Sequence, residues 1–428
     1  MKIQKPKGTD DILPSSIGKW YYVEDMFKKV CEDFAYREIR TPMFESTDLF
    51  KRGVGDTTDI VQKEMFNLEQ RINPGSKKKP ESFSLKPEGT APVVRAYIEN
   101  SLYANPQPTK LFYITPCFRY EQPQEGRKRA FHQFGVEVFS SSNTYTDAEV
   151  ISLAMEFFRR LGIDKYLELR INSVGTAESR KLYSEKLRAF LQNDYEELCD
   201  TCKDRFHKNP IRIIDCKNEK CQKIADGAPL MIDNLSDESQ NNFEELKNNL
   251  DLMGITYTVD PYIVRGLDYY TDTAFEIVSN DIGSQSTVCG GGRYNGLVEQ
   301  LDGPLTPGIG FGLGIERLIM VLENLGISFP EQKKLDLFVI SIGEKADPVS
   351  TKIVHELRTK GISADKDHLK RSIKAQFKYA DKLNSRYTAV IGDDEITSNS
   401  IVLKDMSNST QEKLCLDTFT KDFFDIIK

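Results

Sequence analysis

The sequence predicts an α+β domain built on an antiparallel sheet, interrupted by a helical insertion and followed by a smaller α/β domain. Three observations support this fold class. β-like runs alternate with turns over residues 83–139, a charged helical stretch with four of the eight cysteines spans 175–258, and strands alternate with helices from residue 333. A chain of 428 residues is also too long for one ordinary core. We expect a core domain at 1–325, interrupted by the insertion at 175–258, and a final domain at 333–428.

The first elements of the core domain follow from hydrophobic spacing. A helix is expected at 19–34, where apolar residues recur three and four positions apart. A short strand at 38–41 ends at Pro42, which cannot donate to a ladder. KLFYITPCFRY and AFHQFGVEVF are rich in aromatic and β-branched residues and flank a charged loop with a glycine, so they predict an antiparallel hairpin. A helix with a glycine stop follows at 147–162.

Strand signals return after the insertion, at 262–278 and 286–291, and TPGIGFGLGIERLIMVLENLG reads as a glycine-rich strand running into a helix. A linker is expected around 328–334. Beyond it, LDLFVISIG is a continuous apolar run, which is typical of a strand buried on both faces. Helices near 347–360 and 372–383 alternate with a short strand and with YTAVIG. This alternation predicts a small α/β domain with a mainly parallel sheet.

Composition excludes several classes of protein. With 39% hydrophobic and 29% charged residues the chain is globular, and no run of about 18 apolar residues predicts a membrane span. The polar start predicts no secretory leader, and few cysteines indicate a reducing cytoplasm. G-x-x-x-x-G-K-[ST] and H-E-x-x-H are absent, which argues against a P-loop ATPase and a zinc protease. A net charge of -7 argues mildly against nucleic-acid binding, although basic clusters occur at 127–129 and 370–378.

Three arginines lie within or beside β-like and glycine-rich segments. Arg119 follows an apolar run in CFRYE, Arg265 lies in IVRGLDYY, and Arg317 lies in GLGIERL. A charged side chain in such a place costs free energy unless it meets an anion. For any one of them a buried structural ion pair explains the residue equally well. Three together favour a polyphosphate site, because the arginine fork binds phosphate oxygens at two points.

The same segments resemble the motifs of class II aminoacyl-tRNA synthetases. EIRTPMFE is similar to motif 1, the dimer-interface element; FRYE with its basic loop and FHQFGVEVF is similar to motif 2; GIGFGLGIERL is similar to motif 3. These three motifs indicate only the class. VRGLDYYTDTAFE, GGGRYNGLVEQL and LKPEGT resemble segments of the histidyl-tRNA synthetase family, in which RGLDYY is the specific signal for histidine. The resemblance covers nearly the whole chain.

The resemblance implies a cytoplasmic, homodimeric histidine–tRNA ligase that does not bind membranes. Such an enzyme uses ATP with Mg²⁺ to convert L-histidine to histidyl-adenylate and then charges the 3′ end of its tRNA. The final domain would bind the anticodon. Charge builds on the α-phosphate in the first step, and preorganised cations lower that barrier. By resemblance, Arg119 would hold the α-phosphate and the histidine carboxylate, Arg265 would approach from the other side, and Arg317 would grip the γ-phosphate. These are the three expected catalytic residues.

The resemblance also assigns two substrate pockets. In the ATP pocket Glu121 would contact the adenine edge and Phe131 would stack on its face. The expected ATP-binding residues are Arg119, Glu121, Arg127, Phe131 and Arg317. The histidine pocket needs acceptors for the ammonium and partners for both imidazole nitrogens. The expected histidine-binding residues are Glu88, Gly89, Thr90, Arg119, Gln133, Glu137, Arg265, Tyr269 and Tyr270. Without the neighbouring motif, core packing explains the two tyrosines better.

Four cysteines in the insertion form two close pairs, Cys199-x-x-Cys202 and Cys216-x₄-Cys221. Two pairs of thiols suit a tetrahedral structural Zn²⁺. The spacing inside the second pair is looser than usual, and ordinary reduced cysteines explain the pattern equally well. Both explanations stay open at this point.

Two positions depart from the family pattern. Gln122 stands where arginine is expected, at a position associated with the tRNA acceptor end, and Asn295 stands where aspartate is usual. Three alternatives compete with the ligase. A non-catalytic regulatory subunit of histidine biosynthesis would lack the anticodon domain, a threonyl or prolyl enzyme would lack RGLDYY, and an RNA sensor should have lost Arg265 or Arg317. The sequence keeps all of these features and favours the ligase.

Overall fold

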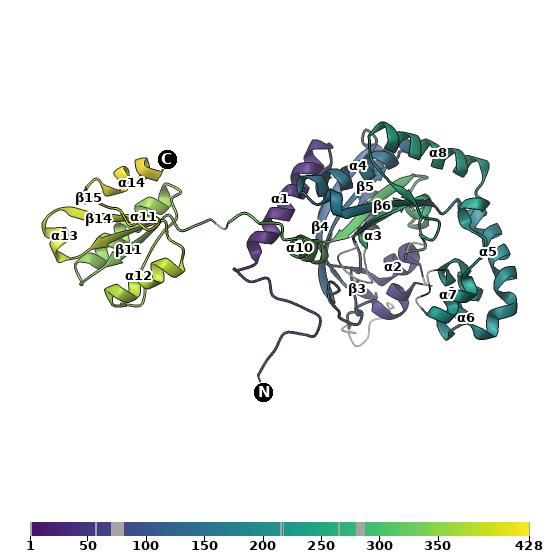
Figure 1. The fold of residues 1–428 in the computed structure, drawn as a ribbon, viewed down its shortest axis with the longest axis horizontal. Helices are drawn as coiled ribbons and strands as arrows, with labels where there is room; N and C mark the ends of the chain where they lie inside the picture. Colours follow the sequence, from purple (N-terminus) through teal and green to yellow (C-terminus); the bar gives the residue numbers. More distant parts are fainter. Residues whose placement is uncertain are drawn as a thin grey trace, which may run out of the picture. The chain divides into compact units, whose positions relative to one another are not determined.

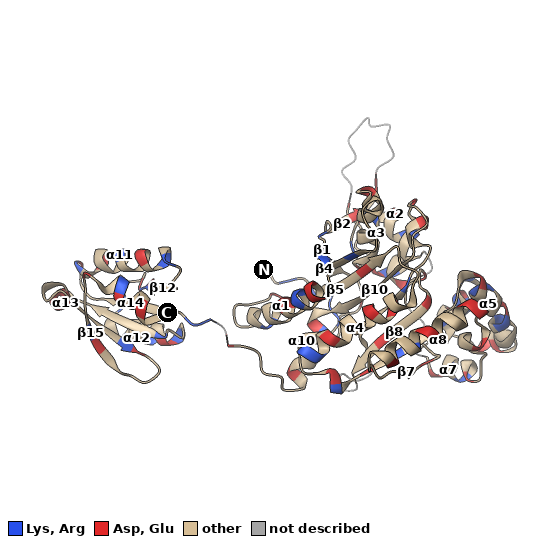
Figure 2. Cartoon of the chain, turned by 90° about the horizontal axis from the view of Figure 1, so that it is seen from above, with Lys and Arg blue, Asp and Glu red and all other residues tan. Residues whose placement is uncertain are grey.

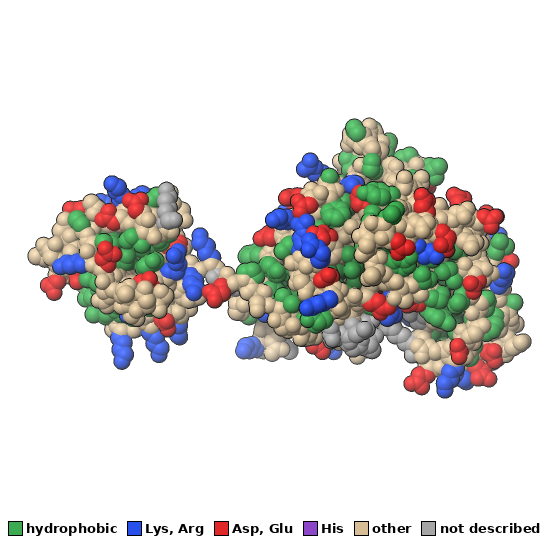
Figure 3. Space-filling model, turned by 45° about the horizontal axis from the view of Figure 1, so that its top comes forward, with side chains coloured by type: hydrophobic (Ala, Val, Ile, Leu, Met, Phe, Trp, Pro, Cys, Tyr) green, Lys and Arg blue, Asp and Glu red, His purple; other side chains and the backbone are tan. Residues whose placement is uncertain are grey.

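The computed structural model describes residues 2–55, 58–69, 81–214, 216, 218–263, 266–279, 287–331 and 333–427. The chain divides into two compact units, Met1–Pro330 and Glu331–Lys428 (Figure 1). Each unit has its own hydrophobic core. No helix in the described part of the chain is both long and apolar enough to cross a membrane. Basic and acidic residues are mixed along the chain (Figure 2), and their side chains are interspersed on the face drawn in Figure 3. The net charge of -7 does not come from one acidic patch on that face.

A mixed, mostly antiparallel sheet forms the centre of the first unit. Within the described residues it has eight strands, in the order β1 (Arg37–Glu38), β4 (Thr109–Phe118), β5 (Ala130–Phe139), β10 (Gly308–Gly314), β9 (Thr287–Arg293), β8 (Thr271–Ser279), β6 (Leu167–Ser173) and β7 (Thr258–Val259). Only the outermost pairs, β1 with β4 and β6 with β7, are parallel. The predicted hairpin is β4 and β5, paired in antiparallel register from Thr109 opposite Phe139. The expected antiparallel core is confirmed.

The two faces of this sheet differ because side chains alternate along each strand. On one face, Phe134, Val136 and Phe311 join the main core. The helices that contribute to this core are α1 (Ile17–Asp33), α4 (Thr144–Arg160), α8 (Asp237–Leu252) and α10 (Ile315–Asn324). Smaller elements complete the unit: β2 (Phe44–Ser46), β3 (Phe83–Leu85), α2 (Thr47–Val54), α3 (Thr90–Glu99), α9 (Leu297–Gln300) and the short helical turns η1 (Ile60–Glu64), η2 (Leu102–Ala104) and η3 (Asp164–Tyr166).

The segment between β6 and β7 contains two different kinds of helix. α5 (Ala177–Leu191), α6 (Asp200–Lys208) and α7 (Glu219–Ala225), with the turns η4 (Gln192–Glu197), η5 (Pro210–Ile213) and η6 (Met231–Asn234), enclose a separate apolar cluster. These helices lie to one side of the sheet (Figure 1). α8 instead packs with the main core through Phe243, Leu246 and Leu250. The separate helical core therefore ends before α8.

The second unit has a five-stranded sheet among the described residues, in the order β12 (Ala364–Lys366), β11 (Leu337–Ser341), β13 (Tyr387–Ile391), β14 (Ser400–Asp405) and β15 (Gln411–Cys415). Its helices are α11 (Ala346–Thr359), α12 (Ile373–Lys382), α13 (Asp393–Thr397) and α14 (Phe419–Ile427). β11 pairs in parallel with β12 and β13, but β14 and β15 add in antiparallel fashion. The expectation of a mainly parallel sheet is therefore wrong for its last two strands. β13 is joined to β14 through the short helix α13, and β14 is joined to β15 through residues 406–410. Connections this short suit antiparallel neighbours, because a parallel crossover needs about a dozen residues or more.

Candidate active site

A cavity of about 330 Å³ lies against the glycine-rich face of the central sheet. Its walls come from the β4–β5 hairpin, the start of α3, the segment 266–270, strands β8 to β10 and the start of α10. Ten of the residues expected from the sequence line it: Glu88, Thr90, Arg119, Glu121, Arg127, Phe131, Gln133, Tyr269, Tyr270 and Arg317. The fold thus gathers into one cavity residues from widely separated segments.

Three expected residues are not among those lining the cavity. Arg265 lies outside the described residues. Gly89 lies beneath Tyr113, where a Cβ atom would come within 2.2 Å of the tyrosine ring. Glu137 is fully buried; the Tyr294 hydroxyl donates to it at 2.6 Å and the Tyr113 hydroxyl at 3.3 Å. Because Tyr113 does line the cavity, Glu137 is connected to it through that hydroxyl.

Glycines at alternating positions of β10 explain why this face is hollow. Gly308, Gly310, Gly312 and Gly314 share a face, and apolar residues between them enter the main core. A Cβ atom on Gly310 would lie 2.0 Å from Glu137 Oε2, and one on Gly308 would lie 2.1 Å from the Tyr294 ring. Glycine at these two positions is therefore required by the buried carboxylate and its tyrosine partner.

Glu88 marks the start of α3. Its carboxylate accepts hydrogen bonds from the backbone N–H groups of Thr90 at 2.7 Å and Ala91 at 2.8 Å, which would otherwise be unpaired at a helix N-terminus. Burial raises the pKa of Glu88, although these amides and the nearby Arg119 oppose the shift. A carboxylate has more acceptor sites than these two bonds use. Glu88 can therefore accept further hydrogen bonds from a ligand.

Glu137 is a second buried carboxyl with a raised pKa. Burial raises its pKa to about 8, against the hydrogen bonds that stabilise the charged form. Its neighbour Glu88 raises the pKa further. Burial and the neighbouring Glu88 both disfavour the charged form of Glu137, because negative charge is costly away from water and more so beside another carboxylate.

Positive charge in the cavity comes from three arginines and Lys128. Arg119 is fixed by its Nε, which donates to the Pro87 carbonyl at 2.8 Å, and its guanidinium carbon lies 5.3 Å from the centre of the Phe131 ring. Burial lowers the pKa of Arg317, and the neighbouring Arg127 cation lowers it further. Two cations held near each other in a cavity are destabilised unless an anion joins them. This part of the cavity is therefore suited to bind phosphate groups.

Some cavity residues were missed by the sequence analysis, among them Tyr113, Glu276 and Glu316. Glu276 accepts a hydrogen bond from the Thr287 hydroxyl at 2.8 Å. Both oxygens of Glu316 lie 3.0 Å from the backbone nitrogen of His132, which links α10 to β5. The sequence did contain a signal for the two glutamates, because Glu276 interrupts an apolar strand and Glu316 is next to Arg317. Tyr113 carried no such signal, since its position opposite Gly135 depends on the strand register.

The two departures from the family pattern lie in different surroundings. Asn295 Oδ1 accepts from the backbone N–H of Gly308 at 3.3 Å, a bond that an aspartate oxygen would also accept. Asparagine therefore preserves this contact. Gln122 is exposed in the loop between β4 and β5, next to Glu121 of the cavity.

The four cysteines of the insertion come together in space. Their sulfur atoms all lie within 4.8 Å of one another, and three of the four residues are buried. The Cys199 and Cys216 sulfurs are 4.0 Å apart, and the backbone N–H of Cys199 points to the Cys221 sulfur at 3.3 Å. Around Zn²⁺ with bonds of about 2.3 Å, tetrahedral sulfurs would be roughly 3.8 Å apart. The arrangement is thus close to that of a four-thiolate site.

The antiparallel sheet with its arginine-lined cavity, followed by an α/β unit, defines the architecture of a class II aminoacyl-tRNA synthetase. The family model described as Histidyl-tRNA synthetase matches residues 8–318, and one described as Anticodon binding domain matches residues 336–423. The chain belongs to the histidyl-tRNA synthetase family.

The chain is similar to individual relatives over nearly its full length. The chain is 54% identical to the histidine–tRNA ligase of Acetivibrio thermocellus over 418 residues, which cover 98% of each protein. It is 52% identical to that of Clostridioides difficile over 423 residues, which cover 99% of each. Its structure is similar to apo S. aureus histidyl-tRNA synthetase, with a TM-score of 0.82 and 43% identity, covering 99% of this chain and 100% of that one.

Proposed function

We infer that the chain catalyses the ATP-dependent ligation of histidine to tRNA, first forming histidyl-adenylate and pyrophosphate and then charging the 3′ end of the tRNA. The observation that carries this conclusion is the cavity in which arginines and buried carboxylates meet, in a chain more than half identical to histidine–tRNA ligases over their full length. A regulatory, non-catalytic role is not favoured, because the similarity includes the anticodon-binding domain.

For adenylation, we assign Arg119 to the α-phosphate and the histidine carboxylate. Its bond to the Pro87 carbonyl and its place beside Phe131 support this role, since a fixed cation need not reorganise as charge builds on the phosphate. Phe131 would stack on adenine and Glu121 would contact its edge. Arg265 is proposed to approach from the opposite side, on the basis of the family resemblance alone.

For the remaining phosphates, we assign Arg317 to the γ-phosphate and Arg127 to the neighbouring oxygens. The mutual repulsion of these two cations supports the assignment, because an anion between them would relieve it. Mg²⁺ accompanies ATP and neutralises part of the phosphate charge. Glu121 pairs with Arg127 at 3.3 Å and would hold this guanidinium in the cavity.

For histidine, we assign Glu88, Thr90 and Gln133 to the ammonium group. Tyr269 and Tyr270 line the same cavity and are proposed to meet the imidazole. Glu137 would act on the imidazole through Tyr113 in this structure. Although the Tyr113 hydroxyl donates to Glu137 and is hydrogen-bonded to Thr90, its oxygen has two lone pairs and can accept from a ring N–H. Such a polar pocket rejects apolar analogues, which would leave its groups unpaired.

The test is exchange of labelled pyrophosphate into ATP by the purified protein. Exchange should require histidine and should not occur with threonine or proline, because adenylate formation is reversible and amino-acid specific. Exchange with another amino acid would change the substrate assignment. Failure with every amino acid would overturn the proposed ligase activity and favour the regulatory alternative.

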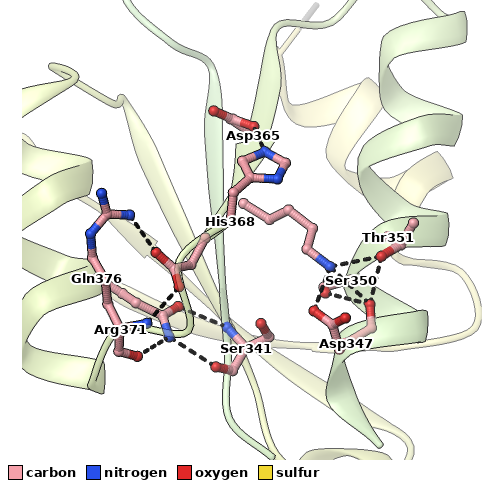
Figure 4. A network of polar contacts seen from close by, with 10 residues as sticks. Ser341, Asp347, Ser350, Thr351, Asp365, His368, Arg371 and Gln376 are labelled. Carbon is pink, nitrogen blue, oxygen red and sulfur yellow. Dashed lines mark hydrogen bonds and ion pairs between the residues drawn. The ribbon is translucent and has the colours of Figure 1, made fainter. Parts of the chain in front are cut away.

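We assign tRNA binding to the insertion, the β4–β5 loop and the second unit. Support in the second unit comes from a polar network that fixes the segment before α12 (Figure 4). The Asp367 carboxylate accepts from the Arg371 backbone N–H at 2.7 Å and pairs with its guanidinium. The Gln376 side chain accepts from the Ser341 backbone N–H at 3.1 Å and donates to the Ser341 carbonyl at 3.0 Å. A rigid base of this kind would present the basic residues of α12 to tRNA phosphates.

We propose that the enzyme is a cytoplasmic homodimer. The segment that resembles motif 1 supports the dimer, because Met43 is 59% exposed and Phe44 is 51% exposed beside Pro42. Neighbouring apolar side chains in water are typical of a surface that a partner covers. Light scattering should give twice the mass of one chain, and Phe44→Glu should shift this value toward that of a monomer. A monomeric wild-type protein would contradict the proposal.

We propose a structural Zn²⁺ bound by Cys199, Cys202, Cys216 and Cys221. The close approach of the four sulfurs supports it, and the ion would replace weak thiol contacts with four bonds. Elemental analysis of protein purified without chelators should give about one zinc per chain. The Cys216→Ser variant should lose it, whereas Cys415→Ser, at an exposed thiol of the second unit, should not. Zinc content near zero in metal-replete wild-type protein would refute the site.

A further inference from the structure

The insertion holds the segment 266–270 through polar groups. Asn209 Nδ2 donates to Asp268 Oδ1 at 3.1 Å, and the Arg212 guanidinium donates to the Gly266 carbonyl at 3.0 Å. From α5, Arg180 donates to the Tyr270 carbonyl and, at 3.4 Å, to that of Asp268. These contacts fall on the segment that carries the two cavity tyrosines.

The segment has a cavity on each side. The active-site cavity includes Leu267, Tyr269 and Tyr270. A second cavity of about 340 Å³ lies between the segment and the insertion. Its wall includes Arg180, Lys181, Tyr183, Asn209, Arg212 and Tyr270. Since empty space removes packing partners, the polar contacts across it contribute more to the position of the segment.

Asn209 and Arg212 lie close in sequence to the cysteine cluster. Both lie at the turn η5, which comes just before Cys216. The backbone N–H of Cys216 donates to the Ile213 carbonyl at 3.0 Å, so this cysteine directly continues the turn. At the other end of the cluster, α6 starts after Cys199 and its Arg205 donates to the Arg212 carbonyl at 3.2 Å. An ion on the four thiols would therefore fix the turn at both ends.

We propose that metal bound to the four cysteines positions the segment 266–270 through Asn209 and Arg212, so that the metal content of the insertion sets the affinity for histidine. The proposal rests on the histidine and zinc sites inferred above. Asn209 and Arg212 act as positioning residues and do not touch the substrate. ATP affinity should change little, because Arg127, Phe131 and Arg317 lie on the β4–β5 hairpin and α10.

The first experiment compares Asn209→Ala with Arg188→Ala. In the described part of the chain, Arg188 donates to the Phe206 and His207 carbonyls at the end of α6, so its loss controls for general weakening of this domain. In pyrophosphate exchange, Asn209→Ala should raise the KM for histidine about tenfold, the usual scale for one bond to a charged group. The KM for ATP should stay within about twofold on the same scale. Arg188→Ala should leave both values unchanged.

A further test exchanges the two side chains of the Asn209–Asp268 hydrogen bond and asks whether the double variant regains histidine affinity. Asn209→Asp places two carboxylates opposite each other and should weaken histidine binding more than Asn209→Ala. Adding Asp268→Asn restores a donor and an acceptor, so the double variant should recover most of the affinity. Variants that change the KM of histidine and ATP equally, or a double variant as poor as the single one, would overturn the positioning role.

The second experiment measures binding of L-histidine and of ATP by calorimetry to the full-length protein, loaded with Zn²⁺ or stripped with a chelator. Stripped protein should bind histidine about tenfold more weakly and ATP as before, and added Zn²⁺ should restore binding. Equal histidine affinity in both forms, failure to take up zinc, or equal loss of both ligands would overturn the coupling. Zinc-loaded protein that binds no histidine would overturn the proposed histidine site as well.

Discussion

At the residue scale, the cavity is organised by carboxylates that are removed from water. Glu88 is held by the first amides of α3, and Glu137 by the hydroxyls of two tyrosines. Each carboxylate orders a neighbouring group that reaches the cavity. Removal from water also makes the charge on these groups depend on pH and on their neighbours.

The titration of Glu137 should make stability depend on pH. Its folded-state pKa is about 8 against an ordinary value of 4.5, so the folded protein keeps a proton that the unfolded chain releases. The stability that comes from this raised pKa is fully present below pH 4.5, the pKa in the unfolded chain, and is lost as pH rises through about 8. Thermal melts should therefore show wild type losing stability relative to Glu137→Gln between pH 5 and pH 8.5, by on the order of a few kcal/mol.

Glutamine keeps the size of the side chain and removes the titration. The groups that face this carboxyl, Tyr294, Thr90, Glu88 and Tyr113, are unchanged in the variant. Melting temperatures that run parallel in the two proteins over this pH range would show that Glu137 does not titrate as its burial requires.

Arg317→Ala should weaken ATP binding without weakening the fold. The lost side chain is a partly buried cation beside Arg127, so its removal relieves repulsion in the free protein and costs one hydrogen bond to the Thr287 carbonyl. The KM for ATP should rise about ten- to a hundredfold, as expected for a cation that binds phosphate, while the melting temperature stays the same or rises.

The matched control is Arg293→Ala, which removes a buried arginine with a structural partner. Arg293 Nε donates to Asp147 at 3.0 Å, and both side chains are almost fully buried. Breaking this pair should cost about 3–5 kcal/mol of stability. If Arg317→Ala destabilised the protein to the same extent, Arg317 would have a structural role and not the one proposed.

At the element scale, β10 shows how one strand serves two purposes. Its apolar residues enter the main core, while its glycines leave room for Glu137, Tyr294 and the cavity. The hairpin β4–β5 works in the same way, with aromatic residues on the core face and Gln133 and Tyr113 on the cavity face. Because side chains alternate between the two faces of a strand, one face of this sheet packs in the core and the other lines the cavity.

Gly310→Ala and Gly312→Ala should have different effects on stability. A Cβ atom at position 310 would lie 2.0 Å from Glu137 Oε2 and 2.2 Å from the Val136 carbonyl, so the strands must shift. We expect a loss of more than about 2 kcal/mol in urea unfolding. At position 312 the nearest atom, Gln133 Nε2, is 3.6 Å away, which is ordinary contact. Equal stability of the two variants would contradict this account.

At the scale of the whole molecule, the residues proposed for adenylation and the match to an anticodon-binding domain lie in different compact units. Every residue assigned to adenylation lies in Met1–Pro330, and the anticodon-binding match lies in Glu331–Lys428. Each unit has a hydrophobic core made of its own residues. The two steps of the reaction should therefore differ in how much they require the second unit.

Protein ending at Pro330 should retain histidine-dependent pyrophosphate exchange within about tenfold and lose most charging of tRNA, because the lost contacts are those to the nucleic acid. Full-length protein is the control in both assays. Loss of exchange by a folded fragment, or normal charging of tRNA, would contradict this division of labour. Circular dichroism would establish that the fragment is folded.

The sequence by itself determined the local elements and the chemistry. Apolar spacing predicted α1, β-like runs predicted the β4–β5 hairpin, and the motifs around Arg119 and Arg317 predicted the class of enzyme. These features are readable because hydrophobic period and motif spacing are properties of short segments. Most of the expected ATP and histidine residues then proved to share one cavity.

Only the tertiary structure decided which segments meet. It placed Glu137 behind Tyr113, packed α8 with the main core, added the β14–β15 hairpin, and set the insertion against the segment 266–270. None of these follows from a local pattern. The hydrophobic period of a helix or strand shows which of its faces is buried. Which element packs on that face depends on strand register and on contacts between residues far apart in sequence.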